Sequence, residues 1–306
     1  MEECNHGGAP ASLGGRPPAG GGGVARVRSY AVGGWVTYCG SDPTCLTLKA
    51  MAIFHGVAIV RYDVTGKFLW QKEIASQDYP PPSVVGLETG EIFVSSPTDH
   101  DFGCGLANAN LAKLDDTGNC VWAKHFLGAV PEFTMNASAA GETFIATVFK
   151  DPVDFGCGLL PSADEGNLAI TKLDVSGNCV FSKAFTGPGF ALAYAGHGYP
   201  HAYPAGGDQW LVSLPFEGSI DLGSGPISAS DVPEGDMLFI KIDASGNPVW
   251  SRRLLIPPYE GTIRRPEISG EPSGGMILAS NNPLLDLGCG PTLNGNAGLY
   301  LAKLAP

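Results

Sequence analysis

One hairpin design recurs along this chain. Each copy contains an apolar strand, a turn of the form Asp-x-Ser/Thr-Gly-Asn/Lys and a second strand centred on Trp or Phe. Four copies and a partial fifth occupy residues 57–74, 110–126, 167–185, 236–254 and 299–306. In such a turn the Asp side chain caps backbone N–H groups and the Gly supplies a positive φ, so the flanking strands form a tight hairpin.

A second hairpin precedes each copy. It is clear at residues 83–95, 136–148 and 266–280, and looser at 27–38 and 203–214. Four of these five hairpins lead into an Asp-Φ-Gly-x-Gly loop, where Φ is apolar, at residues 101–105, 154–158, 221–225 and 286–290. The repeating unit is therefore a pair of hairpins, or four strands.

The length of the unit identifies the fold class. The turn aspartates are 52, 59 and 69 residues apart, at Asp63, Asp115, Asp174 and Asp243. Units of this length with four strands predict an all-β fold, a β-propeller of about five four-stranded blades. A helical solenoid is excluded because the apolar residues alternate with period two.

The repeat also carries a family resemblance. The phrase Leu-Ala-Lys-Leu-Asp-x-x-Gly-Asn-x-Val-Trp-x-Lys, after a Gly-flanked strand and Asp-Phe-Gly, resembles the bacterial β-propeller repeats of SBBP type, which are common in myxobacterial secreted and surface proteins. The resemblance covers roughly residues 26–306. It implies a propeller in an exported protein and carries over no functional residue, because the family is defined by residues that build the blades.

The first 23 residues differ from the rest of the chain. Residues 1–23 are rich in Gly and Pro, without periodicity, and predict a flexible segment before a single propeller domain at 24–306. The fifth unit stops before its fourth strand. Either that blade has three strands, or the N-terminal segment completes it; we favour completion by the N-terminal segment.

Charge and hydropathy exclude some classes of partner. A net charge of −12 argues against nucleic acid, since such binding depends on clustered Lys and Arg. No stretch reaches the ~18 apolar residues of a transmembrane helix. Residues Met1-Glu2-Glu3-Cys4 lack the basic start and apolar core of a signal peptide. The low share of charged residues, 16%, and the cysteines still predict a secreted, extracellular or cell-surface protein.

The eight cysteines follow the repeat. Two units carry cysteines at the same two places, Cys104 with Cys120 and Cys157 with Cys179, and the next unit lacks both. Joint presence and joint absence predict a disulfide within each unit. The remaining pairs are then Cys39–Cys45 and Cys4–Cys289. Metal binding is the alternative, but no Cys-x-x-Cys and no zinc-finger spacing occurs.

Recognisable catalytic motifs are missing. The sequence has no Gly-x-Ser-x-Gly, His-Glu-x-x-His, P-loop or EF-hand loop, so it predicts no catalytic residue and no cofactor. The repeated loop aspartates could bind calcium, at Asp101, Asp154, Asp221 and Asp286. We favour the alternative that each caps the backbone of its Gly-rich turn, because each place offers a single carboxylate.

Aromatic residues fall into a repeating and a non-repeating set. Trp70, Trp122, Phe181 and Trp250 recur at one place in the unit, which predicts packing between blades. The loop at residues 187–207 does not repeat, and it supplies most of the candidate binding residues. The candidates are Tyr194, His197, Tyr199, His201 and Tyr203, with Tyr79 and Tyr259 in other loops between units. Such rings could stack on sugars or dock a protein, or the loop could cover its own aromatics.

Three functions remain open. Rigid repeats with variable loops predict a binding or scaffold module whose loop face takes a protein or glycan partner. A second hypothesis is a propeller that binds or cleaves glycans at the channel mouth; cleavage would need two carboxylates about 5–9.5 Å apart. The third is a subunit that self-assembles into a surface array or fibre through exposed edge strands. We expect a binding protein rather than an enzyme.

Overall fold

The chain folds entirely from β-strands over the part that the structure describes. This computed structural model describes residues 30–31, 56–62, 67–75, 83–87, 89–128, 133–161, 166–187, 190, 199–223, 225–230, 236–256, 267–270, 275–280 and 300–304. Every strand pairs with its neighbours in antiparallel fashion. Within these residues no helix is long and apolar enough to cross a bilayer.

Five sheets correspond to the five predicted units. The first contains β1 (Tyr30–Ala31), β2 (Gly56–Tyr62) and β3 (Phe68–Ala75). The second contains β4 (Ser83–Gly86), β5 (Ile92–His100), β6 (Ala109–Leu114) and β7 (Cys120–Lys124). The third contains β9 (Thr134–Ala137), β10 (Thr143–Phe149), β13 (Asn167–Leu173) and β14 (Cys179–Thr186). The fourth contains β15 (His201–Pro204), β16 (Trp210–Phe216), β19 (Asp236–Ile242) and β20 (Pro248–Leu254). The fifth contains β21 (Glu267–Gly270), β22 (Met276–Ser280) and β23 (Tyr300–Leu304).

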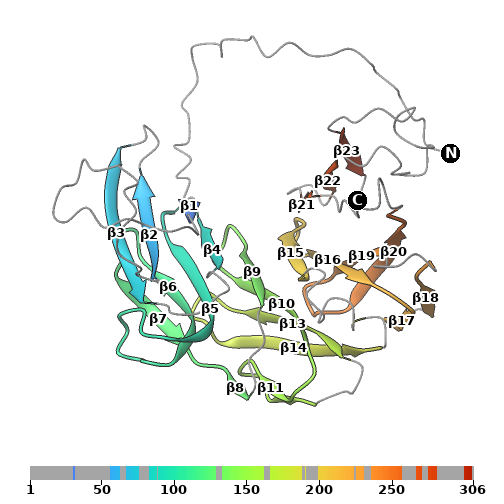
Figure 1. Cartoon of the computed structure of the whole chain (residues 1–306), viewed down its shortest axis with the longest axis horizontal. Helices are drawn as coiled ribbons and strands as arrows, with labels where there is room; N and C mark the ends of the chain where they lie inside the picture. The colour runs from blue at the N-terminus through green and yellow to red at the C-terminus, as the bar shows by residue number, and fades with distance from the viewer. Residues whose placement is uncertain are drawn as a thin grey trace, which may run out of the picture.

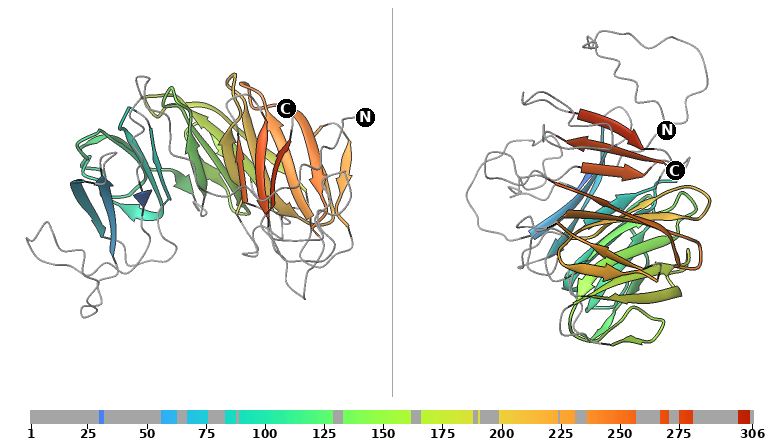
Figure 2. Two further views of the ribbon diagram at one scale, coloured as in Figure 1. Left: turned by 90° about the horizontal axis from the view of Figure 1, so that it is seen from above. Right: turned by 90° about the vertical axis from the view of Figure 1, so that its right-hand side faces the viewer.

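The sheets follow one another along an arc in the order of the chain (Figure 1). The first strands of the second to fifth sheets, β4, β9, β15 and β21, lie on the inner side of this arc, each against the next. The last strands, β3, β7, β14 and β20, lie on the outer side. Figure 2 shows the same succession of separate sheets from two further directions. The first and fifth sheets lie at the two ends of the arc.

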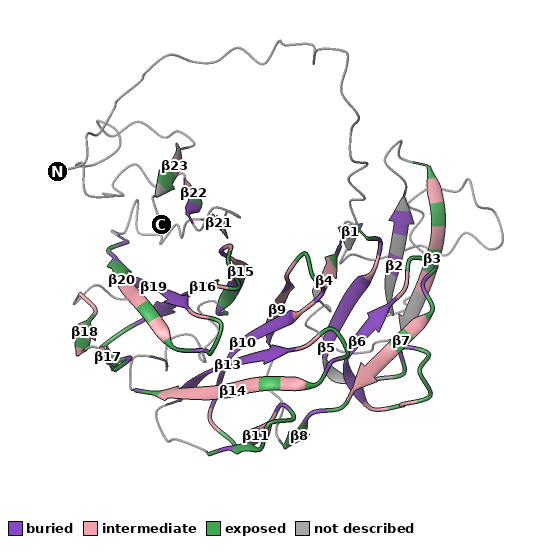
Figure 3. Ribbon diagram, turned by 180° about the vertical axis from the view of Figure 1, so that it is seen from behind, coloured by how far each residue is buried: buried purple, intermediate pink, exposed green. Residues whose placement is uncertain are grey.

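Apolar side chains fill the space between successive sheets. Phe144 of β10 stacks on Trp210 of β16 with ring centroids 4.7 Å apart, while its neighbour Ile145 points to the second sheet. Four clusters of this kind join each sheet to the next. Strands β10, β13, β16 and β19 are therefore buried along their whole length, and the outer strands only in part (Figure 3).

Two small sheets lie outside this repeating plan. One pairs β8 (Leu127–Gly128), β11 (Val153–Asp154) and β12 (Leu159–Leu160), and the other pairs β17 (Ser219–Asp221) with β18 (Pro226–Ser228). Both form where the Asp-Φ-Gly-x-Gly loop of a unit folds back, and β8 continues the outer strand of the preceding sheet. The sequence predicts these segments only as loops.

Candidate functional site

The hairpin turns use their aspartates to hold the backbone. Asp115 Oδ1 accepts hydrogen bonds from the backbone N–H groups of Thr117, at 2.8 Å, and Asn119, at 2.9 Å. Asp174 and Asp243 make the same pair of bonds in their units. In each turn the Gly three residues after the Asp has a φ of 77–84°, the left-handed conformation that favours glycine.

These bonds lower the pKa of all three turn carboxyls. At Asp115 the Thr117 hydroxyl contributes most, followed by the Asn119 backbone N–H. At Asp174 and Asp243 the largest contribution comes from the backbone N–H of the Asn four residues later. Hydrogen bonds to the ionised form favour it, so these aspartates stay charged. Because their Oδ1 atoms accept hydrogen bonds within the turn, these aspartates have a structural role.

Each turn also packs against the outer strand of the preceding sheet. Trp70 Nε1 donates to the backbone oxygen of Asp116 at 2.9 Å, and Trp122 Nε1 donates to that of Val175 at 3.2 Å. We call the aromatic residue, together with the basic residue two positions after it, the outer-strand clamp. The four clamps are Trp70 with Lys72, Trp122 with Lys124, Phe181 with Lys183 and Trp250 with Arg252.

The basic member of the clamp reaches the same turn. Lys72 Nζ donates to the backbone oxygen of Gly118 at 3.0 Å, and Lys183 Nζ donates to Asn247 Oδ1 at 2.6 Å. The ring lies so close that a Cβ on Gly246 would come within 2.7 Å of the Phe181 ring. The recurring aromatics at Trp70, Trp122 and Phe181 are thus occupied by contacts between units, as their repetition predicts.

The Asp-Φ-Gly-x-Gly loops hold their aspartates in the same way. Asp154 Oδ1 accepts from the backbone N–H groups of Gly156, at 2.7 Å, and Gly158, at 3.0 Å. Asp221 does the same with its two glycines, and Asp101 accepts from Gly103. Within the described residues no three acidic, His or Cys side chains converge as a metal site would require. Asp286 lies outside the described residues.

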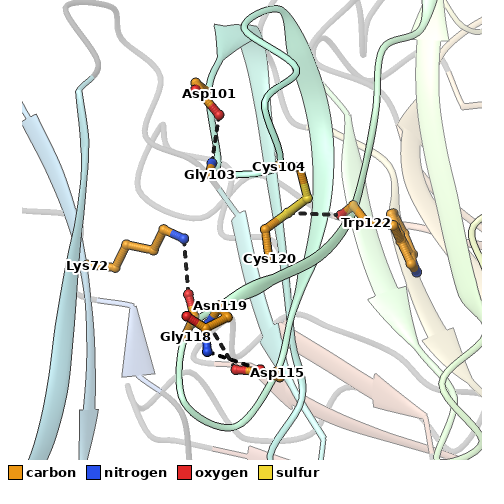
Figure 4. Close-up of a disulfide and its surroundings, with 9 residues drawn as sticks. All are labelled: Lys72, Asp101, Gly103, Cys104, Asp115, Gly118, Asn119, Cys120 and Trp122. Carbon is orange, nitrogen blue, oxygen red and sulfur yellow. Dashed lines mark hydrogen bonds between the residues drawn. A yellow bond between two sulfur atoms is a disulfide. The ribbon is translucent and has the colours of Figure 1, made fainter.

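Two disulfides close these loops onto the following hairpin. Cys104 bonds to Cys120 with 5.3 Å between the Cα atoms (Figure 4), and Cys157 bonds to Cys179 with 5.5 Å. These are the two within-unit pairs that the sequence predicts. They require the loop to fold back along its sheet toward the turn, and it does. The pairs Cys39–Cys45 and Cys4–Cys289 lie outside the described residues.

The repeat contains a further recurring group that the sequence analysis missed. A basic residue occupies the same place in the third strand of four units, two positions before the turn Asp, at Arg61, Lys113, Lys172 and Lys241, and all four are buried. The signal was present in the sequence, because each of these residues stands in a largely apolar strand just before a turn. The strands of Lys113, Lys172 and Lys241 are buried along their whole length.

Lys172 shows how such a charge is accommodated. Its Nζ lies 3.0 Å from Glu142 of its own unit and 2.7 Å from Asp208 of the next unit. Burial lowers the pKa of Lys172, but the hydrogen bonds and charges of Asp208 and Glu142 outweigh this effect and raise it. A buried charge persists when it is paired in this way. Asp208 itself adopts a φ of 63° where the two preceding units have glycine.

The inner strand β15 carries two of the non-repeating aromatic candidates, His201 and Tyr203. Thr134 and Asn136 of β9 donate to the backbone oxygens of Pro200 and Ala202, the latter at 3.1 Å, so β9 and β15 are tied together. His201 and Tyr203 stand at the matching places of β15, and Tyr203 packs against the apolar cluster shared with the fifth sheet. Thr134 and Asn136 thus join the third sheet to the fourth, and an aromatic pair occupies the same two positions of the fourth sheet.

Three of the predicted binding residues can be placed. The rings of His201 and Tyr203 stack with centroids 6.3 Å apart, and Tyr203 packs against the apolar cluster shared with the fifth sheet. His201 is exposed and Tyr199 is 39% exposed. We call Tyr199 and His201 the inner-rim pair. The remaining candidates, Tyr79, Tyr194, His197 and Tyr259, lie outside the described residues.

Comparisons with known proteins give the chain a distant structural likeness. Its sequence matches no profile of a known family and no curated protein. Among solved structures, it is similar to a protein of unknown function from Bacteroides caccae, at 15% identity and a TM-score of 0.32 over 74% of this chain and 78% of the other. It is also similar to a member of the DUF4221 family from Bacteroides vulgatus, at 10% identity and a TM-score of 0.34 over 76% and 72%.

Proposed function

We propose that the chain is a five-bladed β-propeller that acts outside the cytoplasm as a binding module. The five sheets in chain order, the inner strands in mutual contact and the apolar clusters between successive sheets support the propeller architecture. The resemblance of its repeats to the SBBP type points the same way.

The disulfides support the location. Cys104–Cys120 and Cys157–Cys179 hint at an oxidising, extracytoplasmic environment, because thiols stay reduced in the cytosol. Because SBBP-type repeats are common in secreted and surface proteins, we propose that this chain is secreted or lies at the cell surface.

The inner-rim pair carries the functional proposal. The described groups that recur along the repeat are committed to turns, clamps and, in two units, disulfides. Tyr199 and His201 do not recur, and both are exposed, at or just before the start of the inner strand β15. A phenol ring and an imidazole two residues apart offer flat apolar faces with polar edges. This chemistry suits a sugar ring, which stacks through its C–H face and hydrogen bonds through its hydroxyls. We propose a glycan as the ligand.

A panel of immobilised oligosaccharides tests this proposal. We expect the full chain to bind at least one member, and Tyr199→Ala to weaken that binding at least about tenfold, or about 1.4 kcal/mol. Val180→Ala is the control, since Val180 is 52% exposed on the outer strand β14, whereas the pair lies at the inner strand β15. Binding that is unchanged in both Tyr199→Ala and His201→Ala would contradict the site. No binding to any oligosaccharide would contradict the glycan ligand.

A further inference from the structure

The segment at the start of β15 presents three aromatic rings on one face. Tyr199 and His201 are exposed and Tyr203 is half-buried. The residues between them, Pro200 and Ala202, are both buried. This alternation is that of an extended strand, in which every second side chain points to the same side. We call Tyr199, His201 and Tyr203 the inner-rim row.

The neighbouring inner strand holds the backbone of the row in place. Asn136 of β9 donates to the backbone oxygen of Ala202 at 3.1 Å, and Thr134 donates to that of Pro200. Both acceptors belong to the residues between the rings, so the strand that carries the rings is fixed before any ligand arrives. Preorganisation of this kind reduces the entropy that binding would otherwise cost.

The apolar cluster beside the fifth sheet fixes one end of the row. Tyr203 packs against this cluster, next to its cross-strand neighbour Leu211. Its ring is nearly parallel to that of His201, with 22° between the planes and 6.3 Å between the centroids. Tyr203 therefore orients His201, and the rings that solvent reaches most are those of His201 and Tyr199.

The spacing of the two exposed rings sets the size of the ligand. Residues two apart in a strand are separated by about 7 Å along it. A pyranose is about as large as one aromatic ring, so a single sugar covers either Tyr199 or His201. Two consecutive sugars of a chain cover both rings, and each stacks through its C–H face.

The charge of the chain selects among glycans. The net charge is −12 at pH 7. A field of this sign repels a polyanionic glycan, most strongly at low ionic strength. A neutral glycan escapes this repulsion and still stacks on the rings and hydrogen bonds to their polar edges.

We propose that Tyr199 and His201 bind two consecutive units of a neutral glycan chain, one sugar on each ring, and that Tyr203 is a positioning residue that orients His201. The inference rests on the proposed glycan-binding function and specifies the form of the ligand. It assigns the polar donors of β9 a part in the same site, because they hold the strand on which the rings stand.

A length series of soluble oligosaccharides tests the two-sugar site. The probes, titrated calorimetrically into the full chain, are linear oligomers of glucose, mannose and xylose, from one to six units, and the anionic oligomers of galacturonic acid. We expect affinity for at least one neutral series to rise about two- to tenfold from one unit to two, the gain of one further aromatic contact, and then to level off. Affinity that does not depend on length would overturn the two-sugar site and leave the glycan function standing. Tighter binding of the anionic series would overturn the neutral class. No binding in any series would overturn the glycan function itself.

Substitutions in the row test the two roles separately. Tyr199→Ala should abolish the step from one unit to two and leave the affinity for one unit within about twofold. A step that persists in Tyr199→Ala would overturn its place in the site. Tyr203→Leu keeps an apolar side chain but loses the ring, and should weaken binding of two units at least about threefold. Tyr203→Phe keeps the ring and should bind like the unaltered chain. Equal binding by Tyr203→Leu and Tyr203→Phe would overturn the positioning role.

Discussion

The contact between a turn glycine and the preceding aromatic allows a quantitative test at Gly246. We consider the substitution Gly246→Ala. Gly246 has a φ of 78°, and an added Cβ would lie 2.7, 2.8 and 3.0 Å from three atoms of the Phe181 ring. Carbon atoms in favourable contact are about 3.5–4.0 Å apart, so the ring or the turn has to move by roughly 1 Å.

Two costs add at this position. An alanine in the left-handed region costs about 1–2 kcal/mol relative to glycine. Overfilling a packed contact costs about 1–3 kcal/mol more. The free energy of unfolding should therefore fall by about 2–5 kcal/mol.

Gly105→Ala separates the two costs. Gly105 has nearly the same φ, 75°, but a Cβ there meets nothing within 4 Å. This control should lose only the backbone part, about 1–2 kcal/mol. Urea unfolding followed by circular dichroism measures both variants, as a lower midpoint at unchanged slope.

The clash should also depend on Phe181. In a Phe181→Ala background Gly246→Ala should cost no more than Gly105→Ala does, giving a coupling of about 1–3 kcal/mol in the double-mutant cycle. Additive effects of Phe181→Ala and Gly246→Ala, or equal losses for Gly246→Ala and Gly105→Ala, would refute the clamp as a contact between units.

Three further predictions concern the charges and covalent links of the repeat. Lys172→Met should lower the free energy of unfolding by about 2–3 kcal/mol, because two carboxylates then face each other unpaired. Asp208→Asn should lower it by about 1 kcal/mol or less. The urea midpoints of the two variants measure these losses, and equal losses would contradict the pairing. Asp174 has a lowered pKa in the folded state, so its contribution is complete above its ordinary pKa of 3.8 and is lost as the pH falls below it. Asp174→Asn should thus flatten the stability–pH curve below pH 3.8, and an unchanged slope would contradict this. Replacing Cys157 and Cys179 together by Ser should cost about 3 kcal/mol, from the loop of 22 residues they close, and an unchanged melting temperature would show that the bond adds nothing.

The turns could be predicted from sequence because their chemistry is local. Asp174 and Gly177 determine the hairpin through bonds within five residues, and the same pattern recurs at the described turns of Asp115 and Asp243. The disulfide between Cys157 and Cys179 was predictable for a different reason, since the repeat shows two cysteines gained and lost together.

The remaining features depend on contacts that no single unit contains. The small sheet of β8, β11 and β12 forms because the loop after β10 folds back against the outer strand of the preceding sheet, and nothing in residues 153–160 alone specifies that partner. The charge of Lys172 is accommodated by Asp208, which lies 36 residues later in the next unit, so no single unit contains the pair. Likewise, Tyr203 reads as a loop aromatic, yet it packs in the apolar cluster beside the fifth sheet.

The direction of the clamp has a consequence for the order in which the protein matures. Trp70 finds its hydrogen-bond acceptor 46 residues later in the chain, and Trp122 finds its own 53 residues later. During synthesis from the N-terminus, the outer strand of such a sheet therefore emerges well before the turn that accepts its hydrogen bond. Each of these sheets gains that contact only once the turn of the next sheet has been made.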